Sequence, residues 1–390
     1  MKIVVVGGGF GGVKVAIELA RRKVGKITLI SDREYFTHHA LLYSVASGRD
    51  PGATQIPIKE MIKDYPAITF SKDSITSIDP IDKLACGQKK KYRYDQLILS
   101  IGLVNHFYGV NGAKQHSYAL SSLEDVGSLS RDFHERLVEG GRDVVCAVVG
   151  GGVSGVEFAA SLSEYANRIS ESHGKSSAGA KIILLEKSNR ILSGLSNQAE
   201  RKVSTRLKGM GVEIMLNHNM EKVTKTSVVA NGKSTPVDMS IWACGGQSHP
   251  FFMKHNEQFH LSKRGRVVVN QYLSAYPNVY VIGDNAEVSG SGTASSAMHQ
   301  AKFLASHLDR VKTNRPQPAY KPGPRATISI PLSRFWAYSE RFGVYASGLT
   351  GSLCRRIVEL DSYFRLMPAG NAWRFWRMHR KNKELCTICQ

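Results

Sequence analysis

The chain has 390 residues, more than the roughly 100 to 200 of a typical domain, so we expect two or three domains. Apolar residues make up 42% and charged residues 22%, which excludes disordered and fibrous proteins. The sequence shows neither a spanning run of about 18 uncharged apolar residues nor room for a signal peptide before its first strand, so we expect a cytosol-facing protein with any membrane attachment peripheral.

The net charge is +20, which predicts an anionic partner such as a phosphate-bearing cofactor, anionic lipid or nucleic acid, although it also serves solubility. The cysteines are too few and too scattered for a disulfide scaffold, and lie at Cys86, Cys146, Cys244, Cys354, Cys386 and Cys389. A reducing compartment is therefore expected.

The N-terminus carries a dinucleotide-binding pattern. Residues 3–6 are a β-branched run without polar alternation, which predicts a buried parallel strand. Gly7, Gly9 and Gly12 follow in G-x-G-x-x-G spacing and open a predicted helix. They permit a tight turn, close approach of the backbone to a pyrophosphate, and close packing of helix on strand. The pyrophosphate would lie at the positive end of the helix.

A second strand is predicted at residues 26–31. Directly after it, Asp32 is a candidate for the acidic residue that holds a ribose hydroxyl about 20 positions beyond such a turn. Strand, glycine turn, helix, second strand and acid occur in the order that a nucleotide site requires. This order favours a nucleotide site over a purely structural glycine turn.

The same pattern returns in the middle of the chain. A predicted strand at residues 143–149 leads into glycines and a helix, and a further strand at 181–186 closes the unit; the glycines are Gly150, Gly152 and Gly155. Residues 170–180 are rich in Ser, Gly and Ala and predict a loop after an extended helix.

The second unit ends on an acidic residue, Glu186. A carboxylate at this strand end accepts hydrogen bonds from a free 2′-hydroxyl and repels a 2′-phosphate, which favours NADH over NADPH. The nearby charges of Lys187 and Arg190 oppose that preference. Two such units imply two dinucleotides, and the simplest pair is a flavin and a nicotinamide, between which hydride passes readily.

A late apolar stretch at residues 279–284 ends in Gly283 and Asp284, and completes a resemblance. The chain resembles the two-dinucleotide-binding flavoproteins, and among them is most similar to the type II, non-proton-pumping NADH:quinone oxidoreductases. The similarity covers about residues 1–325 and rests on HHALLYSVASG, LILSIG, VVGGGVSGVEF, LLEKSNRIL, IWACGG, NVYVIGDNAE and SSAMHQA. It implies an α/β fold with two Rossmann-like domains of the glutathione-reductase type, and FAD and NADH as cofactors.

The resemblance also assigns the cofactor sites by position. It places the FAD pyrophosphate at the first glycine turn and the ribityl chain of FAD at Gly283 and Asp284. Ser31 takes the strand-end position that is often acidic in such proteins, with Asp32 one place later. NADH is assigned to Gly150, Gly152, Gly155, Glu186 and Gly245.

Glu157 would lie near the place where nicotinamide meets flavin, according to the resemblance. An acid in the first turns of a helix is also favoured by the helix dipole, by about 0.3 to 1 kcal/mol. Both interpretations of Glu157, catalytic and structural, stay open at this point.

The acceptor region departs from the family pattern. Relatives show Ala-Gln-x-Ala-x-Gln on the helix beside the flavin ring, whereas residues 295–300 here read Ser-Ser-Ala-Met-His-Gln. Gln300 keeps the second glutamine, and Ser296 replaces the first with a hydroxyl of shorter reach. His299 stands where a quinone proton donor could lie. These residues are the candidate quinone site.

The cysteines exclude two related chemistries. Flavin disulfide reductases carry a C-x-x-x-x-C pair after the first unit, and residues 33–60 contain no cysteine. Sulfide:quinone reductases need a cysteine around the second glycine turn, where this chain has Ser154. We interpret Cys244 as a small buried filler and the terminal Cys386 and Cys389 pair as incidental, and we assign no metal site.

A proline-rich linker at residues 315–324 precedes a basic and aromatic C-terminus. Residues 352–390 hold eight Lys or Arg against three acids, interleaved with Tyr363, Phe364, Trp373, Phe375 and Trp376. This pattern suits a segment lying on an anionic membrane surface, as C-terminal helices do in the family. Nucleic-acid binding and simple packing on the flavin domain are alternatives, and the resemblance disfavours nucleic acid.

The sequence thus predicts an FAD-dependent NADH:quinone oxidoreductase, peripheral on the cytoplasmic face of a membrane. The expected organisation is an FAD-binding domain at residues 1–110 and 248–325, an NADH-binding domain at 111–247, and a membrane-association segment at 326–390. The alternatives are a soluble NAD(P)H flavoprotein with another acceptor and a redox-responsive binding protein resembling apoptosis-inducing factor. A homodimer is left open.

Overall fold

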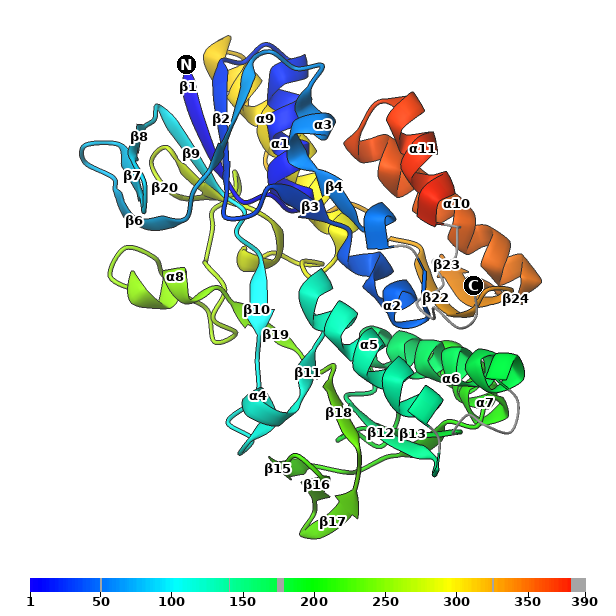
Figure 1. Ribbon diagram of the computed structural model, residues 1–390. Coiled ribbons are helices and arrows are strands. Elements are labelled where there is room, and N and C mark those ends of the chain that lie inside the picture. Colours follow the sequence, from blue (N-terminus) through cyan, green and yellow to red (C-terminus); the bar gives the residue numbers. More distant parts are fainter. Residues whose placement is uncertain (50, 140, 174–178, 325, 380–390) are drawn as a thin grey trace.

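The structure is a computed structural model that describes residues 1–49, 51–139, 141–173, 179–324 and 326–379. Its helices and parallel sheets form two α/β units, one above the other in Figure 1, with the C-terminal helices along one side. The predicted pair of Rossmann-like domains is therefore confirmed. Cys386 and Cys389 lie outside the described residues, as do Arg380, Lys381 and Lys383.

The first unit is built on a sheet that both ends of the flavin region share. Its strands are parallel apart from the edge strand β20, which is antiparallel to β21. In spatial order they are β20 (Ser274–Tyr276), β21 (Val279–Val281), β9 (Gln96–Leu99), β1 (Lys2–Val6), β2 (Lys26–Ser31) and β5 (Ile68–Lys72). Helices α1 (Phe10–Arg21) and α9 (Ala294–Lys312) pack on each other beside it.

Short elements fill the connection between β2 and β5. They are β3 (Tyr35–Thr37), η1 (His39–Leu41), α2 (Leu42–Ala46), η2 (Pro51–Ala53), β4 (Gln55–Pro57) and α3 (Ile58–Ile62). A separate antiparallel sheet follows β5 and comprises β6 (Ile75–Asp79), β7 (Leu84–Gly87) and β8 (Lys91–Arg93). The connection between β2 and β5 links the two units, because its helix α2 packs on α5 and α6 of the second unit.

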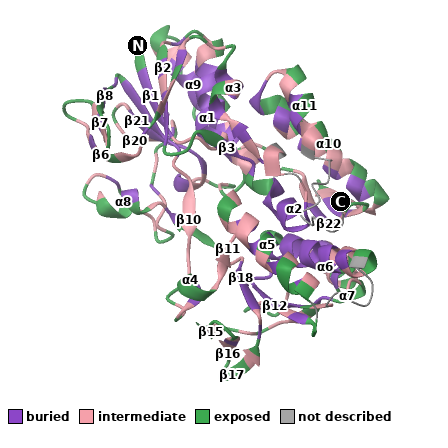
Figure 2. Cartoon of the chain, in the orientation of Figure 1, coloured by how far each residue is buried: buried purple, intermediate pink, exposed green. Residues whose placement is uncertain are grey.

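The second unit has a fully parallel sheet, whose strands Figure 2 shows as largely buried. Its spatial order is β11 (Tyr118–Ala119), β18 (Met239–Trp242), β12 (Val144–Val149), β13 (Ala180–Leu185) and β14 (Glu213–Met215). Its helices are α4 (Ala113–His116), α5 (Leu123–Glu139), α6 (Val153–His173) and α7 (Asn197–Gly209). Helix α6 continues to His173, so the first residues of the predicted 170–180 loop are helical.

Two strands carry the chain between the units. They are the antiparallel β10 (Leu103–Asn105) and β19 (Gly246–Ser248), visible between the two halves in Figure 1. The second unit also carries an antiparallel sheet of β15 (Met220–Val223), β16 (Ser227–Ala230) and β17 (Lys233–Pro236). The chain then returns through α8 (Pro250–Lys254) to β20, and η4 (Gly283–Asn285) follows β21.

The C-terminal segment bridges both units. It begins with an antiparallel sheet that the sequence analysis did not foresee, formed by β22 (Ile328–Ser333), β23 (Trp336–Arg341) and β24 (Val344–Gly348). Helices α10 (Leu349–Leu366) and α11 (Ala369–His379) follow. β22 packs on α6 of the second unit, whereas α10 packs on α1 of the first. In the part of the chain that the structure describes, no helix is long and apolar enough to cross a membrane.

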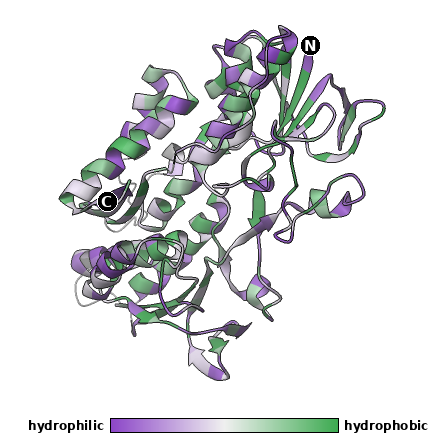
Figure 3. Ribbon diagram, turned by 180° about the vertical axis from the view of Figure 1, so that it is seen from behind, coloured by the Kyte–Doolittle hydropathy of each residue, from purple (hydrophilic) through white to green (hydrophobic). Residues whose placement is uncertain are grey.

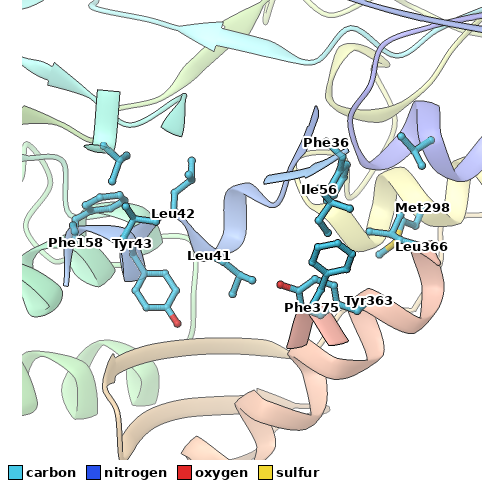
Figure 4. Close-up of a cluster of buried hydrophobic side chains, with 14 of the residues drawn as sticks. Phe36, Leu41, Leu42, Tyr43, Ile56, Phe158, Met298, Tyr363, Leu366 and Phe375 are labelled. Carbon is cyan, nitrogen blue, oxygen red and sulfur yellow. The ribbon is translucent and has the colours of Figure 1, made fainter. Parts of the chain in front are cut away.

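Buried aromatic side chains attach α10 and α11 to the first unit. Figure 4 shows Tyr363 and Leu366 of α10 with Phe375 of α11 facing Phe36 and Ile56 of β3 and β4. A hydrogen bond also connects α1 to α10, because the ammonium group of the buried Lys14 donates to the Arg365 carbonyl at 2.6 Å. Part of the aromatic content of this segment therefore serves packing.

Candidate functional site

The first glycine turn forms a cradle at the start of α1. Gly7 has φ 121°, and a Cβ on Gly12 would overlap the carbonyl oxygen of Gly7, so neither position accepts a side chain. Nothing lies within 4 Å of a Cβ built on Gly9. The first turn of α1 has no acidic residue and no side-chain cap, which leaves its N–H groups for an anion. These features fit the pyrophosphate of a dinucleotide.

The second glycine turn repeats this geometry at the start of α6. Gly150 has φ 111°, a Cβ on Gly155 would overlap the Gly150 carbonyl oxygen, and Gly152 faces open space. The first turn of α6 also lacks an acidic residue. A second pyrophosphate therefore fits here as well.

The register of the two sheets makes Ser31 the counterpart of Glu186. Gly7 N–H donates to the Ile30 carbonyl at 2.8 Å, and Gly150 N–H donates to the Leu185 carbonyl at 2.7 Å. The residue after each acceptor is therefore Ser31 in the first unit and Glu186 in the second. Ser31 is buried, whereas Asp32 is exposed one place later.

Glu186 is held across the second turn. Its carboxylate accepts from Gly151 N–H at 2.6 Å and from Ser188 N–H at 2.7 Å. The guanidinium group of Arg190 is used inside its own loop, where it donates to Asn197 Oδ1 and to the carbonyls of Ser193 and Leu195. A ribose approaching this turn would therefore meet the carboxylate of Glu186. The guanidinium group of Arg190 is already hydrogen-bonded within the protein and would have to give up these acceptors to bind a 2′-phosphate.

Gly245, the last of the NADH candidates, lies beside an aromatic side chain. It has φ 53°, and a Cβ there would collide with the hydroxyl of Tyr108. The neighbouring Cys244 donates its thiol to the Val149 carbonyl at 3.2 Å beside Gly150. Burial raises the pKa of the Cys244 thiol to about 12, so it is not a thiolate at neutral pH. Cys244 lies two residues beyond the end of β18 and is only half-buried, so it is less buried than the filler predicted from the sequence.

The Gly-Asp turn and helix α9 meet through Gln300. Gln300 is fully buried, and its Oε1 accepts from Gly283 N–H at 2.7 Å. Its amide nitrogen donates to Ser291 Oγ at 3.1 Å and to Ser296 Oγ at 3.2 Å. The structure thus brings Gly283, Gln300 and Ser296 together, and it engages both ends of the glutamine amide.

His299 lies on another face of α9. Its Nε2 is 3.1 Å from the Lys321 carbonyl oxygen, and its ring packs beside Tyr320 in the proline-rich linker. It is therefore not brought together with Gln300 and Ser296.

Two residues that the sequence analysis did not assign lie around Asp284. His39 is exposed on η1, and the charges of Asp284 and Arg33 both act on its ring, so each of these two residues lies within electrostatic reach of His39. Asn285 is fully buried, and its Nδ2 donates to the Gly102 carbonyl at 2.8 Å. Within the described ranges its Oδ1 has no partner, which fits a cofactor group at this turn.

Asn285 could have been found from the sequence, since a polar residue follows directly on the Gly-Asp pair at the end of a buried strand. Asp284 itself accepts from Gly292 N–H at 3.0 Å, and burial raises the pKa of its carboxyl. Among the residues that the structure describes, no group of three or more His, Cys, Asp or Glu side chains is arranged to hold a metal ion.

Glu157 is buried in α6 and faces the C-terminal segment. Arg355 of α10 approaches its carboxylate at 3.9 Å, and Arg355 also donates to Glu359 at 2.7 Å. Tyr43 of α2 lies under the guanidinium group, 5.6 Å from its ring centroid. Burial raises the pKa of Glu157 to about 8, against the lowering effect of Arg355. A carboxyl group with that pKa holds a proton at neutral pH.

Comparison with known protein sequences shows which family this chain belongs to. The sequence pattern described as pyridine nucleotide-disulphide oxidoreductase matches residues 1–301, and the chain belongs to this family. A type II NADH:quinone oxidoreductase of Staphylococcus aureus is 23% identical, over 96% of this chain and 98% of that protein. A probable NADH dehydrogenase of Dictyostelium discoideum is 26% identical, over 81% of this chain and 76% of that protein.

Solved structures agree on the fold. NDH2 from Plasmodium falciparum in complex with NADH superposes with a TM-score of 0.84 at 17% identity, over 98% of both chains. The sulfide:quinone oxidoreductase of Aquifex aeolicus superposes with a TM-score of 0.78 at 19% identity, over 98% of this chain and 92% of that one. The family resemblance predicted from the sequence is thereby confirmed.

Proposed function

We propose that the protein is an FAD-dependent NADH:quinone oxidoreductase that pumps no protons. The observation that carries this proposal is the pair of open glycine cradles in one chain, the second of which presents the carboxylate of Glu186 to a ribose. FAD in the first cradle would supply the redox chemistry, taking a hydride from NADH and passing two electrons to a quinone. The relatives named above carry this activity in their names.

The residues of the chain have distinct proposed tasks. The first turn and Asp284 hold FAD, with Ser31 and Asp32 at the adenosine end and Asn285 beside the Gly-Asp turn. The second turn, Glu186 and Gly245 hold NADH and favour it over NADPH. Together, the two sets of residues would align the cofactors, because hydride transfer depends on the positioning of the reactants more than on acids or bases.

Quinone reduction also requires protons, and Glu157 is the proposed holder of one. Its pKa of about 8 keeps it protonated at neutral pH while it can still release the proton. Gln300 is proposed as a positioning residue, since its amide fixes Gly283 and the hydroxyl of Ser296. Ser296, half-buried at the first turn of α9, accepts from Gln300 and keeps its hydroxyl hydrogen to donate to a quinone oxygen.

The C-terminal segment is proposed as the attachment to an anionic membrane surface on the cytoplasmic face. Exposed apolar residues follow one side of α10 and the tip of the β23–β24 hairpin: Leu349, Leu353, Ile357, Phe342 and Val344. In Figure 3 the C-terminal helices show hydrophobic stretches between hydrophilic ones. Arg341 and Arg356 beside these residues suit anionic lipid. Nucleic acid is not proposed, and a homodimer stays a prediction.

The decisive experiment is steady-state NADH oxidation with menaquinone and ubiquinone analogues, with and without anionic liposomes. We expect bound flavin in the purified protein and quinone turnover that liposomes increase. The matched variant replaces Leu349, Leu353 and Ile357 by Ser, since these exposed side chains leave the buried face of α10 intact. A protein without flavin absorbance would refute the proposal, and rapid ferricyanide but no quinone turnover would favour a soluble reductase with another acceptor.

A further inference from the structure

A group of arginines surrounds a hollow between the α2 region and the C-terminal segment. The hollow has a volume of about 60 Å³, and its wall comes from the end of α2, the β22–β23 turn and α10. Arg49, Arg334 and Arg356 line it together with Ser333. That space holds several water molecules or one tetrahedral anion.

The arginine at the floor of the hollow is fully engaged. Arg355 donates to Glu359 at 2.7 Å, to the Ser329 carbonyl at 2.8 Å and to the Ala40 carbonyl at 2.9 Å. It therefore builds the wall, and the one carboxylate of the lining, Glu359, already has its partner.

The other three guanidinium groups lack such partners. Among the described residues, neither Arg49, Arg334 nor Arg356 has a carboxylate within ion-pair distance, although Arg365 and Arg374 of the same segment each have one. Three like charges around one hollow repel each other, by about 1 kcal/mol per pair at 4 Å in water and more at lower dielectric. An anion in the hollow would relieve this repulsion.

The chemistry of the lining selects a phosphate-type oxyanion. Guanidinium groups bind phosphate oxygens bidentately, and three of them from separate elements can contact one tetrahedral group from different sides. The Ser333 hydroxyl, which has no hydrogen bond to another described residue, adds a donor.

The rim of the hollow indicates what carries the phosphate. The neighbours of the lining residues along the chain are apolar and exposed: Phe335 at 55%, Leu353 at 58% and Ile357 at 61%. A free phosphate ion makes no use of such a rim, whereas a phosphate ester with acyl chains does. We propose that Arg49, Arg334 and Arg356 form a specific site for the phosphate group of an anionic phospholipid. This inference rests on the proposed membrane attachment and gives it a defined headgroup contact.

The test is cosedimentation of the full chain with phosphatidylglycerol vesicles and with phosphatidylcholine vesicles at one ionic strength. The variant R49Q/R334Q/R356Q is compared with K89Q/K90Q/K91Q, which removes the same charge from exposed lysines around the β7–β8 turn, on the opposite side of the molecule in Figure 1. Each basic residue at an anionic surface contributes about 1 kcal/mol, so the arginine variant should bind about 100-fold more weakly. The lysine variant should lose less than about threefold. An equal loss in both variants would overturn the site, because diffuse charge would then explain binding.

A second arm separates lipid from free anion. Short-chain phosphatidylglycerol below its micelle concentration should raise the melting temperature of the wild type and not of R49Q/R334Q/R356Q, whereas inorganic phosphate at the same concentration should raise neither. Equal stabilisation by both ligands would overturn the lipid assignment. Bound flavin and ferricyanide reduction serve as checks of folding. R356K keeps the positive charge without the planar guanidinium group, so its vesicle binding should be weakened less than that of R49Q/R334Q/R356Q. Vesicle binding requires neither NADH nor quinone, so failure of quinone turnover alone would refute only the enzymatic proposal.

Discussion

Arg355 on α10 and Glu157 on α6 face each other at 3.9 Å, and each side chain is only 10% exposed. The residues belong to the C-terminal segment and to the second unit, and lie 198 positions apart in the chain. Glu359 shares the same guanidinium group. This buried cluster joins α10 to α6, the helix that follows the second glycine turn.

Removal of Arg355 should strongly destabilise the protein. Arg355→Met leaves the Glu359 carboxylate buried without its cation, and breaking a buried pair in this way costs about 3 to 5 kcal/mol. The measurement is the free energy of unfolding from urea titration. Arg365→Met is the matched control, because Arg365 and Asp361 are each about half exposed and such pairs contribute about 0 to 1 kcal/mol. Similar losses in both variants would contradict a buried cluster.

The protonation of Glu157 should appear in the pH dependence of stability. Burial raises its pKa from 4.5 to about 8, so the native protein keeps a proton that the unfolded chain releases above about pH 4.5. The contribution of this carboxyl to stability is complete below that pH and is lost as the pH rises through 8. We expect the melting temperature of the wild type to fall between pH 5 and about 8.5 more steeply than that of Glu157→Gln.

The same substitution tests the proposed proton transfer. Glu157→Gln should lower quinone turnover by about 100-fold, whereas ferricyanide, which takes up no proton, should be reduced as in the wild type. In the wild type, quinone turnover should decline above about pH 8. Equal effects on both acceptors would indicate that Glu157 acts earlier, on NADH binding or hydride transfer.

Local signals made most of the fold predictable. The β-branched runs, the glycine spacing and the Gly-Asp turn each lie within a dozen residues, and the structure has strands β1, β12 and β21 where they were expected. The sheet of β22 to β24 was missed, because the prediction for the C-terminal segment rested on the composition of residues 352–390 and made no use of the pattern of residues 328–348. The Arg355 and Glu157 contact has no sequence signal, since it depends on how distant elements pack.

Two glycines of the first turn, Gly9 and Gly12, allow a structural role to be compared with a ligand-binding role. In Gly12→Ala the new methyl group would overlap the Gly7 carbonyl oxygen, so the turn itself must shift. In Gly9→Ala the methyl group meets open space in the protein but would stand where a pyrophosphate approaches. Both variants should therefore lose bound FAD by visible absorbance. Only Gly12→Ala should lower the melting temperature of the flavin-free protein, and equal melting temperatures would contradict the close approach of turn and helix.

Glu186 should control the choice of nicotinamide cofactor. Glu186→Gln keeps an acceptor for Gly151 N–H but removes the charge that repels a 2′-phosphate. We expect the ratio of kcat/KM for NADPH to that for NADH to rise about tenfold, which corresponds to a modest loss of charge repulsion near the surface. Lys187→Gln is the control at an exposed neighbouring position and should not raise this ratio. An unchanged ratio in Glu186→Gln would assign its carboxylate a purely structural role in the turn.

Gln300 should prove a positioning residue, because each end of its amide is already bonded inside the protein. Gln300→Leu leaves Gly283 N–H buried without an acceptor, which costs about 1 to 3 kcal/mol of stability, and should also weaken FAD binding at the Gly-Asp turn. Ser296→Ala removes one of the two hydroxyl groups that accept from the Gln300 amide nitrogen, and Ser291 remains. This variant should therefore keep its flavin and its stability but show a raised KM for quinone. A Gln300→Leu protein with normal flavin content and stability but poor quinone turnover would instead place Gln300 in direct contact with the acceptor.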